Sequence, residues 1–434
     1  MPGRLFFNLL KRKKRKMNFT DVLSPVVRAI YAAREKEGRA EEPRRYLGAS
    51  IIGHECEMYL WLMFRGVIAQ KFDGRMFRLF ERGRREEAEI CRDLRSIGCK
   101  VWDKDEDGNQ FGISFLGGHF RGHCDAVAVG IPEAPGKPHV VEMKTHSSKS
   151  FADLKKKGVK LAKPMHHAQM MIYMYGMEID DALYFAVNKD TDDLYTERIK
   201  LDKAEAEKIV AKAKKVIETY EPMKCATREE DDYRCKICEA RTVCWHRTGA
   251  VFACETCIDC RTCCHSTPLT EGEGAKWECA KGKTCVIGSP CKCKEHLAIP
   301  TLIAGELDTA HDRAIVYKDA EGKKFVNGRS GFSTEELMKM PIDAAGLTVE
   351  FCEKFGGTFV GGNTLEKKYK DHPVIWSGNK VEAKAYLSEN GYDGFALTAE
   401  EKGFGVEYYE FCHKKLVITH TDKGLVEIKD MEAF

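Results

Sequence analysis

Hydrophobic segments that could cross a membrane or direct export are missing from the sequence. No uninterrupted apolar run is long enough to span a bilayer. The apolar stretch at residues 5–10 is too short for a signal peptide, and it precedes the nearby basic residues instead of following them. We therefore expect a protein without a membrane association that resides in the cytoplasm.

Net charge is also small, since 70 Lys and Arg face 67 Asp and Glu, which leaves +3. The charge is unevenly spread: residues 1–46 carry thirteen basic and five acidic side chains, and residues 11–16 have no acidic interruption. A basic arm on a near-neutral body suits contact with a phosphate backbone. A disordered tail that aids solubility is the alternative interpretation.

Cysteine, in contrast, is abundant: the chain has nineteen, of which twelve lie between Cys235 and Cys293. In a small secreted protein this number would indicate disulfides, but this chain has 434 residues and no export signal. In a reducing compartment, clustered cysteines indicate metal or iron–sulfur ligation. The sequence thus predicts the class of chemistry and leaves the metal open.

Hydrophobic periodicity indicates a mixed α/β protein. An amphipathic helix over residues 75–98 precedes short apolar runs that predict strands, among them residues 120–129 and 139–144. Helical patterns return at residues 164–176 and 203–220. This order fits an α/β layer with a mixed sheet.

An acidic constellation lies on two of the predicted strands. Asp125 stands in an apolar run, and seventeen residues later comes Glu142-Met143-Lys144. Because side chains alternate along a strand, Glu142 and Lys144 project to the same face. A hairpin would bring Asp125 beside Glu142 and form a carboxylate pocket for Mg²⁺ or Mn²⁺. Such a metal would lower the pKa of a bound water, and Lys144 would hold that water and neutralise charge developing on a phosphate.

This pattern resembles the PD-(D/E)XK nucleases, in which an Asp is followed at a distance by Asp/Glu-x-Lys. The resemblance implies a restriction-endonuclease-like core, a mixed central sheet flanked by helices, that hydrolyses phosphodiester bonds. It also implies that Asp125, Glu142 and the Met143 carbonyl bind metal and that Lys144 is a catalytic residue that holds or activates the attacking water. Taken alone, Glu-x-Lys is a common exposed pair on a strand.

Two further motifs extend the resemblance to RecB-type exonucleases. Gln169 and Tyr173 share one face of the next predicted helix and match Gln-x-x-x-Tyr, which implies contact with nucleic acid near the cleaved phosphate. The alternative is that Tyr173 and the methionines around it are core residues. Upstream, Glu87 falls where the family often has a metal-binding His, with Glu86 as the alternative ligand.

Four cysteines bracket these motifs. Cys56 lies upstream, and Cys235, Cys238 and Cys244 follow the last helix of the predicted core. The order is similar to that of the iron–sulfur nucleases, such as the CRISPR-associated adaptation exonuclease and the helicase-linked nucleases of recombination. The resemblance implies a [4Fe–4S] cluster that closes a loop around the whole active site. Zinc bound by the same four thiolates is the alternative.

A second group of cysteines follows within 40 residues and has few large apolar residues for a core of its own. Its members are Cys254, Cys257, Cys260, Cys263, Cys264, Cys279, Cys285, Cys291 and Cys293. Metal would therefore stabilise this segment. Two Zn²⁺ sites are the favoured interpretation, and a second iron–sulfur cluster is the other.

The predicted organisation has four parts. Residues 1–45 form a basic N-terminal arm, 46–250 a nuclease domain with an iron–sulfur clamp, 251–300 a Cys-rich metal-binding module, and 301–434 a mixed α/β C-terminal domain to which we assign no chemistry.

The resemblance implies a deoxyribonuclease that acts on DNA ends or single strands, as an exonuclease of recombination, replication or DNA repair, and a phage is a fitting source. No Gly-x4-Gly-Lys-Ser/Thr motif occurs, so unwinding would come from a helicase or another recombination or replication partner. The alternative is a catalytically inactive nuclease fold that serves as a nucleic-acid-binding scaffold. RNA as the substrate also stays open.

Overall fold

A computed structural model describes most of the chain up to residue 339 and five strands beyond it. The described residues are 24–39, 44–68, 70–221, 223–227, 229–245, 252, 254, 258–282, 293, 295–311, 314–318, 322, 324–328, 332–339, 357–359, 374–378, 408–411, 416–420 and 426–430. They divide into two compact units, one from residues 1–43 and 71–90 and the other from residues 44–70 and 91–434. None of the described helices is both long and apolar enough to cross a membrane.

The first unit consists of helix α1 (Pro25–Arg39) and the first part of helix α3 (Gly74–Ser96). Asp73 caps α3 by accepting the main-chain N–H three residues further on, at 2.7 Å. The two helices approach closely because Gly74 has no side chain. A Cβ at that position would lie 2.4 Å from Tyr31 Cα.

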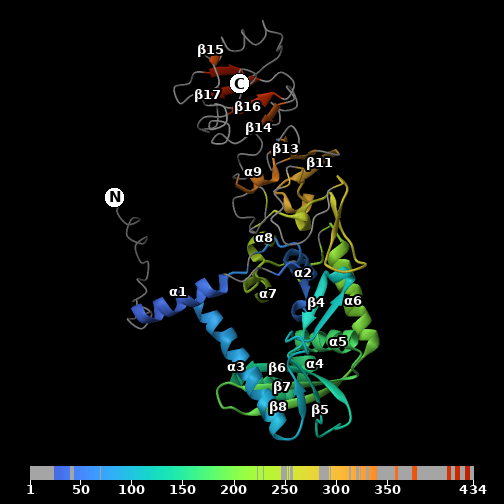
Figure 1. Ribbon diagram of the computed structural model, residues 1–434. Coiled ribbons are helices and arrows are strands. Elements are labelled where there is room, and N and C mark those ends of the chain that lie inside the picture. Colours follow the sequence, from blue (N-terminus) through green and yellow to red (C-terminus); the bar gives the residue numbers. More distant parts are fainter. Residues whose placement is uncertain are drawn as a thin grey trace, which may run out of the picture. The chain divides into compact units, whose positions relative to one another are not determined.

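A five-stranded mixed sheet, in the order β2-β5-β6-β7-β8, is the centre of the second unit (Figure 1). Its strands are β2 (Lys100–Trp102), β5 (Ala126–Val129), β6 (Pro138–His146), β7 (Asp181–Asn188) and β8 (Leu194–Lys200). Strands β6 and β7 are parallel, and all other neighbours are antiparallel. A parallel pair needs a crossover connection, which helices α4 (Ser148–Ala162) and α5 (Pro164–Met177) supply.

Helices α4 and α5 pack against β6 and β7, and α6 (Lys203–Glu218) packs against α5 and α2 (Glu57–Phe64). Every residue of β7 is buried, as expected for a central strand covered on both faces. A mixed sheet flanked by helices confirms the predicted α/β fold class.

A smaller sheet stands beside the large one, in the order β1-β4-β3. It contains β1 (Leu47–Gly48), β3 (Gly112–Phe115) and β4 (Phe120–His123). The sequence predicted one strand over residues 120–129, and this prediction was wrong. The segment is two strands in two sheets, β4 and β5, because the chain leaves the first sheet at Cys124 and Asp125 before it enters the second.

The remaining elements of the second unit are short. They are α7 (Tyr233–Lys236), α8 (Arg241–Trp245), β9 (Ser266–Pro268), β10 (Trp277–Cys279), β11 (Glu306–His311), β12 (Ala314–Lys318), β13 (Lys324–Gly328), α9 (Thr334–Lys339), β14 (Gly357–Phe359), β15 (Val374–Gly378), β16 (Tyr408–Phe411), β17 (Leu416–His420) and β18 (Val426–Asp430).

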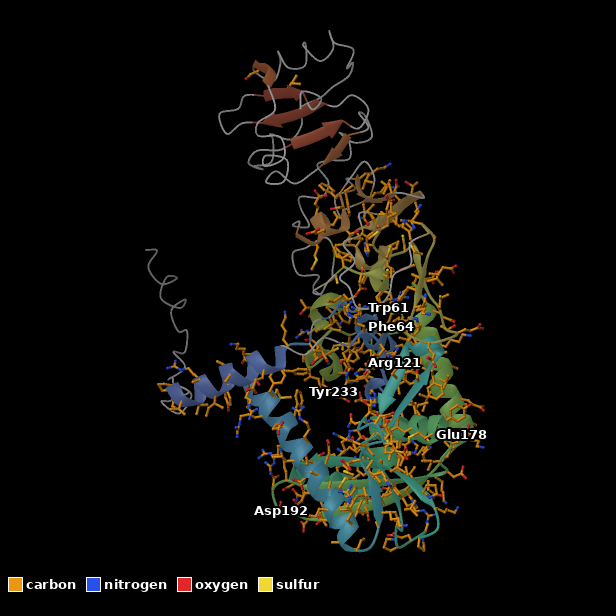
Figure 2. The ribbon with its side chains drawn as sticks, viewed as in Figure 1. Trp61, Phe64, Arg121, Glu178, Asp192 and Tyr233 are labelled. Atoms are coloured by element: carbon orange, nitrogen blue, oxygen red, sulfur yellow. The ribbon has the colours of Figure 1, made fainter. Side chains whose placement is uncertain are left out.

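Arg65 joins α2 to the Cys-rich segment. Its side chain is fully buried, and it follows Trp61 and Phe64 of α2, which Figure 2 labels. The guanidinium lies 4.7–5.8 Å from the ring centroids of four aromatic residues: Trp61, Phe64, Tyr220 and Trp277. Its N–H groups donate to three main-chain carbonyls, those of Ile217, Thr219 and Arg261. Burial lowers the pKa of Arg65 to about 10, so it remains charged at neutral pH.

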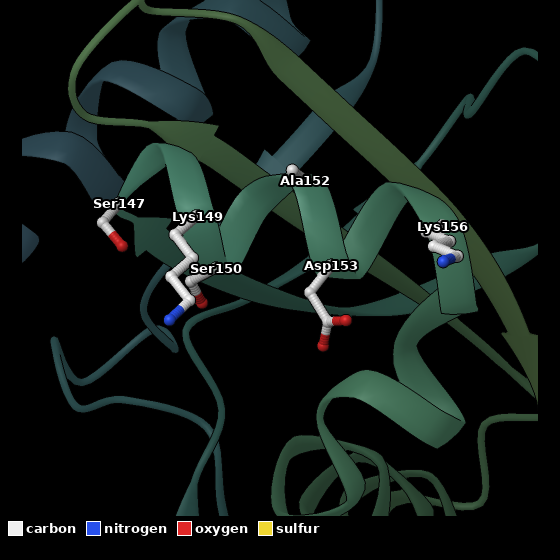
Figure 3. Close-up of a pocket in the computed structure, with 6 residues that line it drawn as sticks. All are labelled: Ser147, Lys149, Ser150, Ala152, Asp153 and Lys156. Carbon is white, nitrogen blue, oxygen red and sulfur yellow. The ribbon is translucent and has the colours of Figure 1, made fainter.

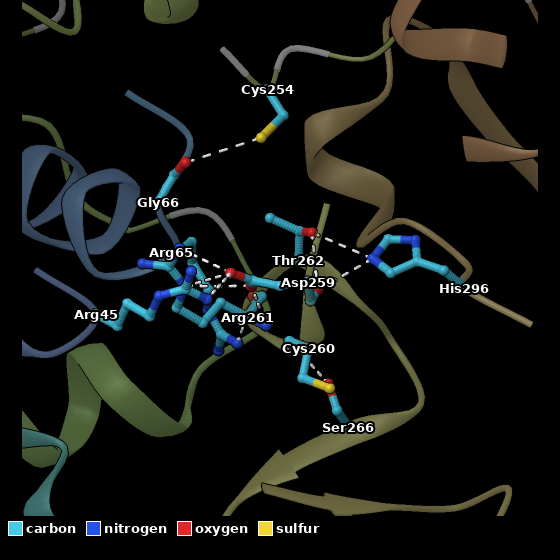
Figure 4. A network of polar contacts seen from close by, with 10 residues as sticks. All are labelled: Arg45, Arg65, Gly66, Cys254, Asp259, Cys260, Arg261, Thr262, Ser266 and His296. Carbon is cyan, nitrogen blue, oxygen red and sulfur yellow. Dashed lines mark hydrogen bonds and ion pairs between the residues drawn. The ribbon is translucent and has the colours of Figure 1, made fainter. Parts of the chain in front are cut away.

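A polar network continues from Arg65 into the Cys-rich segment (Figure 4). Arg261 donates from Nη2 to Asp259 at 2.8 Å, and Arg45 lies 3.8 Å from the same carboxylate. On the other side of the network, Thr262 Oγ1 lies 3.1 Å from His296 Nε2. Buried apolar residues of the segment, among them Phe252 and Trp277, also belong to the core cluster of the sheet and helices. The described part of this segment is therefore packed into a shared core.

Candidate active site

Asp125 stands at the point where the chain passes from the small sheet to the large one. Strand β5 pairs with β6 so that Ala126 lies opposite Val141, which brings the preceding Asp125 to the level of Glu142. The Asp125 carboxylate accepts the main-chain N–H of Met143 at 2.7 Å. This bond fixes Asp125 beside β6, as the predicted hairpin required.

Three oxygen atoms converge on the ammonium group of Lys144. Glu142 Oε1 lies 2.5 Å from Lys144 Nζ, the Met143 carbonyl oxygen 3.0 Å and Asp125 Oδ2 3.4 Å. The Glu142 side chain is fully buried, whereas Lys144 is about a quarter exposed. The residues predicted from the sequence are thus together, with Glu142 innermost and Lys144 toward solvent.

Opposing effects act on the pKa of Lys144. Burial by itself lowers this pKa, but the charges of Glu142 and Asp125 outweigh it and raise the pKa well above the ordinary lysine value. Lys144 is therefore held as a cation. At neutral pH it can donate hydrogen bonds and stabilise negative charge, but it cannot take up a proton.

The donor set suits a hard divalent cation, since it consists of two carboxylates and a carbonyl oxygen around one point. Only two carboxylates contribute here, and among the residues that the structure describes no group of three or more His, Cys, Asp or Glu side chains is arranged to hold a metal ion. Glu87 lies half-buried on α3, in the first unit. Its role as a third ligand stays a prediction.

Gln169 and Tyr173 lie one turn apart on α5. The Gln169 amide donates to the Tyr173 hydroxyl at 2.9 Å, and both side chains are more than nine-tenths buried. Burial and then the charge of Glu142 raise the pKa of Tyr173, which places its hydroxyl near the carboxylates. Gly122 makes room for it, because a Cβ there would lie 3.1 Å from the Tyr173 hydroxyl. The methionines of this helix, Met170, Met171 and Met174, are fully buried core residues.

A second polar chain, which the sequence did not reveal, begins two residues beyond Lys144. The Tyr184 hydroxyl lies between two imidazoles, 2.8 Å from His146 Nε2 and 2.9 Å from His166 Nδ1. Ser150 Oγ lies 3.2 Å from the other nitrogen of His146. Burial, followed by the charges of nearby lysines including Lys144, lowers the pKa of His146 to about 4.

The sequence contained only a weak signal for this chain of His and Tyr side chains. Residues 142, 144 and 146 share one face of β6 by strand alternation, and Tyr184 pairs in register with Glu142 on the neighbouring strand β7. His166 precedes Gln169 by nearly one helical turn. Without the β6–β7 register, however, nothing linked Tyr184 to either histidine.

A model of the PD-(D/E)XK nuclease superfamily matches residues 21–245, just over half of the chain. The chain belongs to the PD-(D/E)XK nuclease superfamily. No curated protein matches it.

Several solved structures share a slight likeness with this PD-(D/E)XK protein. One is an alkaline exonuclease from Laribacter hongkongensis, with 16% identity and a TM-score of 0.30 over 44% of this chain and 90% of that one. The same values hold for its complex with dAMP. A phage-related exonuclease from Haemophilus somnus 129PT has 17% identity and a TM-score of 0.23 over 32% of this chain and 68% of that one.

The cysteines that bracket the PD-(D/E)XK motifs lie near one another, although the described residues include no group of three cysteines arranged to hold a metal ion. The thiols of Cys56, Cys235, Cys238 and Cys244 are close enough for their charges to affect one another. Cys225, which the sequence did not single out, lies near them, since burial and then the Cys56 and Cys235 thiols raise its pKa. Cys244 is exposed to solvent, and desolvation by the surrounding chain and then the neighbouring thiols raise its pKa to about 12.

Main-chain and side-chain contacts hold the same two segments together. The N–H of Met58 donates to the Lys224 carbonyl at 3.2 Å, and Lys212 Nζ donates to the His54 carbonyl at 2.7 Å. Proximity of the early and late cysteines therefore does not depend on thiol ligation alone.

The second group of cysteines is only partly described. Cys257, Cys285 and Cys291 lie outside the described residues. Cys263 is buried, and burial raises its pKa to about 12, with smaller effects of the Cys264 and Cys293 thiols. Cys254 is buried against the Gly66 carbonyl, at 3.8 Å, while Cys260 and Cys279 are half-buried. Zinc in this segment stays a prediction.

Proposed function

We propose that this PD-(D/E)XK protein is a Mg²⁺- or Mn²⁺-dependent DNA nuclease that acts as an exonuclease on DNA ends or single strands. The observation that carries the proposal is the convergence of Asp125, Glu142 and the Met143 carbonyl on Lys144 Nζ. Oxygen ligands for a hard cation beside a charged lysine fit metal-assisted phosphodiester hydrolysis. Recombination, replication or DNA-end processing, with a helicase as partner, is the biology we propose for it.

Each residue of the site has a distinct role in this proposal. Asp125, Glu142 and Met143 would hold the cation, with Glu87 as a further ligand, and the bound metal would lower the pKa of the attacking water. Lys144, kept charged by the carboxylates, would orient that water and stabilise the charge that develops on the phosphate. Gln169 and Tyr173 are buried and hydrogen-bonded to each other, and the charge of Glu142 acts on Tyr173, so we propose that this pair positions the site and the strand near the cleaved phosphate.

The decisive experiment compares cleavage of end-labelled single-stranded and double-stranded DNA, and of RNA, with Mg²⁺ or Mn²⁺. The wild-type protein should cut DNA, and the variants Glu142→Ala and Lys144→Ala should each have lost this activity. Matched controls are Glu218→Ala and Lys214→Ala, which remove an exposed ion pair of the same charges at 3.8 Å and should cut normally. If the wild type cuts no substrate, the inactive-scaffold alternative replaces this proposal. Cutting that survives both site variants would overturn the assigned site.

We further propose a [4Fe–4S] cluster on Cys56, Cys235, Cys238 and Cys244, supported by the proximity of their thiols. Thiolates are the usual ligands of such clusters, and the repulsion between neighbouring thiolates is a penalty that bound iron removes. Anaerobically purified protein should contain about four irons per chain. Serine at any of the four should remove the iron, whereas Cys99→Ser, which changes a buried cysteine outside the group, should not.

Zinc is the competing metal for these thiolates, and it is our proposal for the second group of cysteines, Cys254 to Cys293. The same metal analysis separates the two. Zinc without iron, even after anaerobic work, would overturn the cluster. Iron with no zinc would overturn the proposed zinc sites.

A further inference from the structure

A surface hollow of about 630 Å³ lies along the first turns of α4, directly after the strand that carries Glu142 and Lys144. Figure 3 shows the side chains that line it, from the residue before the helix to its third turn. They are Ser147, Lys149, Ser150, Ala152, Asp153 and Lys156. None of the residues discussed as metal ligands is among them.

Most of the charged side chains of α4 are positive. The helix carries five lysines and one acidic residue, Asp153. Lys157 Nζ lies 2.8 Å from Asp153 and offsets its charge, so Lys149 and Lys156 give the hollow a positive character. Lysines seven residues apart are separated by about 10 Å along a helix axis. That distance is about three phosphate steps of a B-form strand, at roughly 3.4 Å of axis per step.

The hollow begins where the catalytic strand ends. Ser147 directly follows β6, which carries Glu142 and Lys144. Ser150 lines the hollow and its hydroxyl lies 3.2 Å from His146 Nδ1, the first imidazole of the chain that reaches Tyr184. Lys163 donates to the same hydroxyl at 2.6 Å, which adds a further positive charge at this end.

Local geometry keeps this part of α4 in place. The helix breaks at Gly158, whose φ of 72° is in the left-handed region that glycine adopts without strain. Glu197 on β8 accepts the N–H of Val159 at 2.8 Å and fixes the break against the sheet. The lysines thus stand on a packed helix anchored at both ends, because Ser148 also donates its N–H to Asp190 at 2.8 Å.

We propose that this hollow, the α4 groove, binds the phosphate backbone of the nucleic-acid strand whose bond is cut. Ammonium and hydroxyl groups beside an open channel suit a polyanion that extends past the site, and the aliphatic stems of the lysines suit the sugar edges. The inference rests on the proposed function, because the groove would hold the substrate strand on one side of Lys144. Contacts of this kind hold the strand in register without sequence preference.

The test measures binding instead of cutting, with a fluorescein-labelled single-stranded oligonucleotide and a Glu142→Gln background that leaves the oligonucleotide intact. Lys149→Ala combined with Lys156→Ala should lower the slope of log affinity against log salt by about 1.4, from roughly 0.7 per lost phosphate contact. With equal affinities of the two proteins at about 1 M salt, this change of slope equals a loss of affinity of about 25-fold at about 0.1 M salt.

The matched control is Lys155→Ala combined with Lys160→Ala. It removes the same charge from the same helix at two exposed lysines that do not line the groove, and its slope should change little. Equal losses from both pairs, or no loss from the groove pair, would overturn the proposal.

A second measurement needs no variant. Limited acetylation followed by mass spectrometry should find Lys149 and Lys156 protected by bound oligonucleotide and Lys155 unprotected, and equal modification of all three contradicts the groove. Failure of the proposed nuclease function is a separate outcome, since it appears as wild-type protein that binds but cuts no substrate.

Discussion

Lys144 Nζ lies 2.5 Å from Glu142 Oε1, and the two residues share one face of β6. Asp125 adds a second carboxylate at 3.4 Å from the same ammonium. A single lysine therefore neutralises two carboxylates that the fold holds close together. The stability of the protein should therefore depend on a cation, either the Lys144 ammonium or a metal ion, that balances these two carboxylates.

Removal of that lysine should make the protein dependent on a divalent metal for stability. Lys144→Ala leaves Asp125 and the buried Glu142 facing each other, which should lower the free energy of unfolding by about 3 kcal/mol at neutral pH without metal. Because Mg²⁺ or Mn²⁺ can replace the lost charge, it should raise the melting temperature of the variant more than that of the wild type. Thermal unfolding with and without metal measures this, with Lys214→Ala as the control. Equal metal responses would contradict the proposed ligand set.

Tyr184 and Tyr317 offer a matched pair of buried tyrosines. Tyr184→Phe removes a hydroxyl bonded to two buried imidazoles and should lower the free energy of unfolding by about 1–3 kcal/mol. The hydroxyl of Tyr317 is buried with no hydrogen-bond partner among the described residues. Tyr317→Phe should therefore be neutral or slightly stabilising. Urea denaturation measures both, and a loss of the same size at the two positions would show that the His–Tyr–His chain contributes nothing specific.

Stability should fall as the pH drops below about 6.5. Burial is the largest cause of a lowered pKa at seven histidines, His54, His119, His139, His146, His166, His167 and His296. Three of them have a pKa of about 3 or 4 in the fold, against about 6.5 in the unfolded chain. The unfolded chain therefore binds more protons below pH 6.5, and unfolding becomes easier as the pH falls.

Near pH 5, each of those three histidines should contribute a slope of about 1.4 kcal/mol per pH unit to the free energy of unfolding. Urea midpoints recorded between pH 7.5 and 5 give the total slope and hence the number of protons taken up. An uptake of at least three is expected. Constant midpoints over this range would show that these histidines are not buried as neutral groups.

Arg65→Lys should loosen the Cys-rich segment although it keeps the charge. A lysine cannot reach three carbonyls in fixed directions or stack flat on aromatic rings, so carbonyls such as those of Ile217 and Arg261 lose their donor. We expect a loss of about 3 kcal/mol or more, with faster proteolysis between residues 246 and 300. Lys214→Arg, at an exposed lysine of α6, serves as a control that retains charge. Unchanged proteolysis of Arg65→Lys would show that Arg65 does not hold the segment in place.

Neighbouring residues in the candidate site were predictable because regular backbone geometry determines them. Strand alternation placed Glu142 and Lys144 on one face, and helical periodicity placed Gln169 within 2.9 Å of Tyr173. These relationships hold for any strand or helix that contains the motifs. The α/β fold class followed from the same periodicities.

The sequence by itself also set the order of the cysteines, but only the tertiary structure brought Cys225 to Cys56 and placed the Tyr184 hydroxyl between two histidines. It likewise decided that the chain breaks at Asp125 between two sheets and that Arg65 is buried under four aromatic rings. The physical reason is the number of residues that separate the contacting groups along the chain. Contacts within about one helical turn or along one strand follow from local backbone geometry, whereas contacts across 150 residues or more depend on sheet register and on side-chain packing in the shared core.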